Sequence, residues 1–175
     1  MAETNPTSSI LRGLVRLTIG CVYCSGVISI IGLVFLAIFF TGGPGYFGPL
    51  NDLAVAIQYV LMLPIAMTVW LALRPYGERL NLIALLIGLA GMISVSTLQI
   101  LLITGVLPFR LQIGMVIPAF LVTLGWFVLT GHLGRSSGIL PRSRLLHILA
   151  GLYIGYPVWA FMLGHRLLRS SQIED

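Results

Sequence analysis

Charged side chains occur only in short segments of this chain, and the long stretches between them are almost wholly apolar. Hydrophobic residues make up 58% of the sequence and charged residues 9%. A soluble domain carries roughly 25% charged residues, because its surface faces water. Each apolar run is long enough to cross about 30 Å of hydrocarbon, where a helix satisfies its own backbone hydrogen bonds. We therefore predict an all-α integral membrane protein.

Five such runs predict a bundle of five transmembrane helices. The predicted spans are residues 14–40, 52–73, 80–104, 111–131 and 145–168. They form one membrane domain, 14–168, between short polar tails at 1–13 and 169–175.

The positions of the ten basic residues, all arginine, predict how the bundle is oriented. Connections rich in arginine tend to stay in the cytoplasm. With five spans, seven arginines share one side, and Arg110, Arg166 and Arg169 lie on the other. This distribution predicts a cytoplasmic N-terminus and a C-terminus outside, although Arg166 and Arg169 would themselves prefer the cytoplasm.

Polar residues gather in the half of the bundle that is predicted to lie outside. Side chains of this kind in a membrane usually face the bundle interior or a wet cavity. We therefore hypothesise an outward-facing polar pocket in which Asp52 and Arg110 form an ion pair. Interhelical hydrogen bonds, and capping of the second span by Asn51 or Asp52, explain the same residues equally well. The candidate pocket residues are Asn51, Asp52, Gln58, Gln99, Arg110, Gln112 and His165.

Small residues four positions apart occur in the third and fifth spans. Ala84 and Gly88 form one pair, and Gly151 and Gly155 form the other. Because small residues let membrane helices approach closely, both pairs predict tight helix contacts, within the chain or with a partner.

Few residues are candidates for a redox, metal-binding or catalytic role. Cys21 and Cys24 have the spacing of a redox pair, but they lie within the first span, away from groups that would activate a thiolate, and we interpret them as small packing residues. His132 and His147 could form a two-histidine site, but catalytic zinc needs a third protein ligand. We predict no metal and no cofactor. The arginines form no basic stripe, so we also expect no nucleic-acid partner.

Three short segments carry a family resemblance: residues 48–53 (GPLNDL), 137–142 (SGILPR) and 150–153 (AGLY). They resemble segments of a large family of uncharacterised bacterial multipass membrane proteins, a domain of unknown function. The resemblance implies a location in the bacterial inner membrane, and it carries over no catalytic residues.

These observations lead us to expect a protein without intrinsic catalysis. It would be an accessory or assembly subunit of a larger membrane complex, or a module that binds a small ligand or a lipid. One alternative is a small transporter that works as a homodimer through the polar pocket. Another is a membrane enzyme on a lipid or isoprenoid substrate, with Asp52, His132 or His147 as general acid or base. The expected partners are the bilayer and a larger complex or a second copy of the chain.

Overall fold

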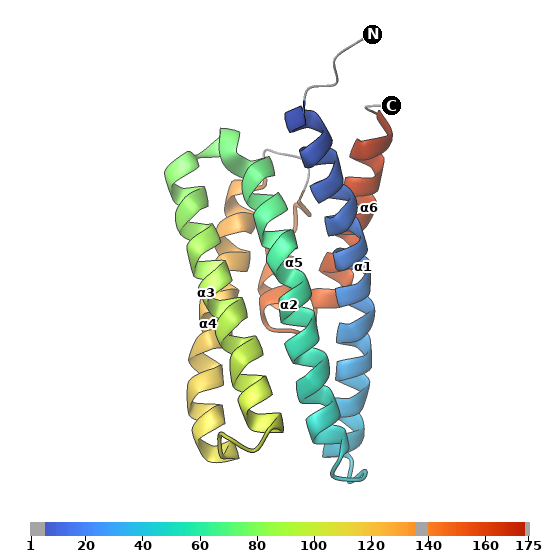
Figure 1. Cartoon of the computed structure of the whole chain (residues 1–175), viewed down its shortest axis with the longest axis vertical. Coiled ribbons are helices and arrows are strands. Elements are labelled where there is room, and N and C mark those ends of the chain that lie inside the picture. The colour runs from blue at the N-terminus through green and yellow to red at the C-terminus, as the bar shows by residue number, and fades with distance from the viewer. Residues whose placement is uncertain (1–5, 136–139, 174–175) are drawn as a thin grey trace.

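The computed structural model describes residues 6–135 and 140–173, and in these residues every regular element is a helix (Figure 1). Four long helices are followed by two shorter ones. They are α1 (Pro6–Phe40), α2 (Phe47–Leu73), α3 (Glu78–Ile103), α4 (Phe109–Leu133), α5 (Arg144–Gly151) and α6 (Tyr156–Ile173), with the 3-10 turn η1 (Arg74–Tyr76) between α2 and α3. Thus α1 begins inside the predicted N-terminal tail, and α6 continues into the predicted C-terminal tail.

Four segments are long and apolar enough to cross a membrane. They are Gly13–Phe40, Phe47–Tyr76, Glu78–Ile103 and Phe109–Leu133. They correspond to the first four predicted spans and confirm the prediction of an all-helical chain. By fold, the described part of the chain is all-α, with four helices that could span a membrane.

Sharp turns place consecutive long helices side by side and antiparallel (Figure 1). At Gly42 and Gly105, the φ angles are +88° and +73°, which glycine adopts without the steric penalty of a Cβ atom. Along the bundle, α1 packs against α2, α2 against α3, and α3 against α4.

The predicted fifth span, 145–168, is not one continuous helix. Its first part is α5 and its second part is α6, separated by a turn at residues 152–155. In this turn Tyr153 has a φ of +73°, and the Gly155 amide donates to the carbonyl oxygen of Leu149 at 2.9 Å. A Cβ atom on Gly155 would lie 2.8 Å from the backbone of Leu149, so the turn closes tightly only with glycine there. The two helices therefore form a hairpin, named here the α5–α6 hairpin.

The second arm of this hairpin returns toward the side from which the first arm enters (Figure 1). Helix α6 runs antiparallel to α1: Gly26 lies against Ala160 and Phe161, and Gly164 lies further along, against Val22 and Tyr23. The start of α1 and the end of α6 consequently lie at the same end of the bundle. The expectation of termini on opposite sides rested on a fifth complete crossing, which the hairpin does not make.

This path changes the distribution of arginines. Arg166 and Arg169 join the seven arginines that were predicted to share one side, so nine of the ten lie at the end that holds the start of α1. We call it the arginine-rich end. Arg110, at the start of α4, is the remaining arginine, at the opposite end.

Aromatic side chains join the hairpin to the rest of the bundle. Trp159 of α6 lies between Phe127 and Trp126 of α4, with ring centroids 5.0 and 6.1 Å away. All three rings are almost fully buried. The hydroxyl of Tyr156, also on α6, is 2.7 Å from the hydroxyl of Ser25 on α1. The hairpin is thus packed between α1 and α4.

Candidate functional site

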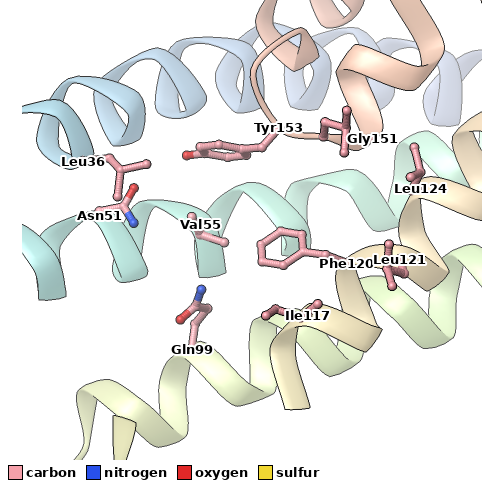
Figure 2. Close-up of a pocket in the computed structure, with 11 residues that line it drawn as sticks. Leu36, Asn51, Val55, Gln99, Ile117, Phe120, Leu121, Leu124, Gly151 and Tyr153 are labelled. Carbon is pink, nitrogen blue, oxygen red and sulfur yellow. The ribbon is translucent and has the colours of Figure 1, made fainter. Parts of the chain in front are cut away.

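A cavity of about 380 Å³ lies beyond the tip of the α5–α6 hairpin (Figure 2). Its wall combines residues of α1, α2, α3 and α4 with the hairpin tip. The lining residues are Leu36, Asn51, Val55, Gln99, Ile117, Phe120, Leu121, Leu124, Gly151, Leu152 and Tyr153.

The position of this cavity follows from the path of the chain. The hairpin fills the space between α1 and α4 only as far as its turn, because α6 then runs back to the arginine-rich end. Leu36 and Gln99 lie about one turn from the ends of α1 and α3, and Asn51 about one turn from the start of α2. The cavity therefore occupies the half of the bundle away from the arginine-rich end, where a continuous fifth helix would have run.

The wall is mainly apolar, and none of the described lining residues is charged. Its polar side chains are Asn51, Gln99 and Tyr153. Asn51 is only 8% exposed, and within the described part of the chain neither its Oδ1 atom nor the Tyr153 hydroxyl makes a hydrogen bond of normal geometry. Ser29 of α1 interacts with the Tyr153 hydroxyl. Buried polar atoms are normally paired, so these two oxygens are the polar atoms of the wall with unused hydrogen-bonding capacity.

A buried amide pair closes the α3 and α4 side of the cavity. Gln112 Nε2 donates to Gln99 Oε1 at 3.0 Å, and both side chains are buried. This bond orients Gln99 so that its amide nitrogen points toward Val55 across the cavity (Figure 2). Gln58 is buried on α2 without lining the cavity, and its Oε1 has no partner among the described residues.

The structure separates the other predicted pocket residues from the cavity. Asp52 is half-buried and Arg110 is exposed, and in residues 6–135 and 140–173 no ion pair joins them. His165 is exposed on α6, beside Arg166 and near the arginine-rich end. Of the seven candidates, therefore, Asn51 and Gln99 line the cavity, and Gln112 supports Gln99.

Tyr153 is the polar lining residue that the sequence hypothesis missed. It was assigned to the middle of a continuous span, where a tyrosine has no special role. The available signal was the GLYIG segment, residues 151–155, in which two glycines flank the turn. These glycines do not share one helix face, because Gly151 ends α5 and Gly155 precedes α6, but each lies at a close contact, Gly151 with Leu124 and Gly155 with Leu149.

The small residues of the third span lie at a close helix contact. Ala84 and Gly88 are both buried, and the Trp126 ring of α4 lies directly over Gly88. At the hairpin, Gly151 lies against Leu124 of α4. A Cβ atom there would be 2.9 Å from the backbone of Leu124, so this glycine allows the hairpin tip to reach α4.

The cysteines and histidines lie apart from the cavity. Cys21 and Cys24 are both free thiols, and Cys24 is exposed. His147 is buried and its Nδ1 atom donates to the carbonyl oxygen of Ser143 at 2.9 Å, whereas His132 is exposed. In the described residues, no three His, Cys, Asp or Glu side chains are grouped so that they could hold a metal ion.

No family model, no curated protein and no solved structure matches this chain. The resemblance to a family of bacterial membrane proteins remains an expectation. Residues 137–139, which carry part of it, lie outside the described residues.

Proposed function

We propose that this protein is a membrane-embedded binding protein that holds the apolar chain of a lipid in the cavity beyond the α5–α6 hairpin. The observation that carries this proposal is the cavity itself. Its volume of about 380 Å³ falls within the roughly 300–1,000 Å³ of typical ligand pockets. Its apolar wall and its few convergent polar groups are the usual composition of such a pocket.

The side opening of the cavity supports a lipid as the occupant. Ile117 and Leu121 line the cavity, yet they are 53% and 59% exposed, so the cavity reaches the surface of α4. At this depth a membrane protein faces acyl chains rather than water. A lipid chain can therefore enter sideways from the bilayer. Its affinity would come from dispersion contacts with a preformed wall, because lipid and wall are equally apolar.

The arginine distribution supports an orientation for this site. Nine arginines at one end favour a cytoplasmic position for that end, and both termini would then lie in the cytoplasm. We propose that the protein lies in the inner membrane and that the cavity faces the outer leaflet.

Lipid binding belongs to the ligand-binding alternative among the functions considered from the sequence, and it is compatible with an accessory role in a larger complex. The enzyme hypothesis has less support at this site, because its candidate acid–base groups, Asp52, His132 and His147, line no part of the cavity. The transporter hypothesis used a polar pocket with Asp52 and Arg110, and neither of these two residues lines the cavity.

A photocrosslinking experiment tests the proposal. The protein in lipid nanodiscs is illuminated with a hexadecane that carries a diazirine, and the labelled peptides are identified by mass spectrometry. We expect labelling to concentrate on residues 117–124 and 151–153.

The variant Leu121→Trp should remove most of this labelling, because the indole fills the opening of the cavity. Leu86→Trp on α3 is the matched control, since Leu86 is 58% exposed but does not line the cavity. Labelling spread evenly over the exposed helix faces and unchanged by Leu121→Trp would refute the proposal.

A further inference from the structure

Two oxygen atoms with unused hydrogen-bonding capacity converge at one side of the cavity. The Tyr153 hydroxyl and Asn51 Oδ1 both lie within 3.5 Å of one point, the position that a Cβ atom would occupy on Gly32 of α1. Both oxygens are buried, and neither makes a hydrogen bond of normal geometry with a described residue. The Ser29 side chain of α1 interacts with the Tyr153 hydroxyl, which leaves a tyrosine hydroxyl free to donate elsewhere. Figure 2 shows the tyrosine ring crossing the cavity toward Asn51. Glycine at position 32 leaves the room in which they meet.

The position of Tyr153 is unfavourable by itself. Its backbone has a φ of +73°, a left-handed conformation that a bulky non-glycine residue seldom adopts. Backbones of this kind persist where the surrounding structure holds them, and they cluster at functional sites. Glycine would suit the turn better, but it would place no hydroxyl beside Asn51.

The chemistry of the two oxygens limits what can satisfy them together. Asn51 Oδ1 only accepts hydrogen bonds, whereas a tyrosine hydroxyl can donate or accept. An alcohol oxygen placed between them donates to Asn51 and accepts from Tyr153. A ketone or ester oxygen cannot donate, so it would leave Asn51 unpaired. A carboxylate or an ammonium would carry a charge into a cavity whose described lining residues have none, which is strongly unfavourable.

We infer that the cavity selects an uncharged lipid with a hydroxyl group, bound between Asn51 and Tyr153, with its hydrocarbon chain along Val55, Ile117 and Phe120. This inference rests on the proposed lipid-binding function and adds the class of ligand. Gln99 supplies a further amide donor on the opposite wall, toward which a second polar group of such a lipid could extend.

Competition between molecules of equal chain length tests the inference. Unlabelled hexadecanol, hexadecane and palmitate each compete against the diazirine-bearing hexadecane in nanodiscs. For the wild-type protein we expect hexadecanol to compete about tenfold better than hexadecane, which is the effect of about 1.4 kcal/mol. Palmitate should not exceed hexadecanol.

Two variants test whether the Tyr153 and Asn51 oxygens cause the preference for hexadecanol over hexadecane. Tyr153→Phe keeps the ring and Asn51→Leu keeps the side-chain shape, so each should lose the preference for hexadecanol while hexadecane still labels the cavity. That labelling also reports an intact cavity. Tyr23→Phe, which removes a hydroxyl on α1 away from the lining, is the control and should keep the preference.

Each other outcome contradicts a different statement. Hexadecane labelling with no preference for hexadecanol, as expected if the oxygens bind only water, would overturn the hydroxyl inference and leave lipid binding standing. The best competition by palmitate would overturn the inference of an uncharged ligand. No labelling of the cavity by the probe would overturn lipid binding itself.

Discussion

The indole ring of Trp126 lies directly over the backbone of Gly88, where an added Cβ atom would be 2.7 Å from Cγ of the ring. Close packing of this kind is how membrane helices gain van der Waals contacts that lipid cannot supply. Gly20 on α1 is different, because no atom lies within 4 Å of its added Cβ. Glycine therefore allows close helix packing at position 88 and has no such role at position 20.

We predict opposite effects for the same substitution at these two glycines. Gly88→Ala should lower the free energy of unfolding by roughly 1–3 kcal/mol, because the methyl group overpacks the contact with Trp126. Gly20→Ala should be neutral or slightly stabilising, since alanine favours the helix and meets open space. Unfolding in mixed micelles of increasing denaturing detergent measures both. Equal midpoints for the two variants would contradict the close contact of α3 and α4.

Polar contacts lie at the open end of the α5–α6 hairpin. Arg166 Nη1 on α6 donates to the carbonyl oxygen of Leu140, in the connection that leads into α5. The Ser143 side chain caps α5 by accepting from the Leu146 amide at 3.3 Å. A continuous fifth span would carry Arg166 to the far side of the bilayer, away from Leu140. The Arg166 contact thus links α6 to the connection that enters α5, as only the hairpin path allows.

Removal of the Arg166 contact should loosen the hairpin. Arg166→Met keeps much of the apolar stem but leaves the Leu140 carbonyl without this donor, so we expect roughly 1–2 kcal/mol of lost stability. Hydrogen exchange followed by mass spectrometry should show faster exchange across residues 140–151. Arg169→Met, at an exposed position of the same helix, should leave these rates unchanged. If both variants exchange alike, the contact is not what holds the arms together.

For the whole molecule, the hairpin decides on which side the chain ends. Four long helices and a hairpin return the end of α6 to the arginine-rich end, whereas five crossings would take it to the opposite end. With the hairpin, nine of the ten arginines agree with one orientation. With five crossings, the number is seven. The hairpin therefore fits the positive-inside rule better.

Cysteine labelling in intact cells distinguishes the two paths. In a variant with Cys21 and Cys24 replaced by serine, single cysteines are placed at exposed positions 46, 76, 106 and 169. We expect a membrane-impermeant maleimide to label 46 and 106 from outside, and to label 76 and 169 only after the cells are opened. Labelling of 169 together with 46 in intact cells would instead support five complete spans.

The sequence by itself determined the class of protein and the position of four helices. In hydrocarbon, a long uncharged run is most stable as a helix, because a single helix pairs its own backbone amides and carbonyls. The same reasoning predicted the depth of Asn51 and Gln99, since counting residues along a helix measures depth. It assigned His165 to the wrong end of the bundle, because that count assumed an unbroken helix.

Only the tertiary structure decided the path of residues 145–168 and, with it, the cavity. The run has the hydropathy of a span whether it crosses the membrane or turns back, so composition does not separate the two. In the hairpin, Trp159 packs against Trp126 of α4, and Arg166 donates to the carbonyl oxygen of Leu140 at the open end. These partners are distant in the sequence. Tyr153 lies close to Asn51 because of the hairpin path, and the spacing of residues in the sequence does not predict this proximity.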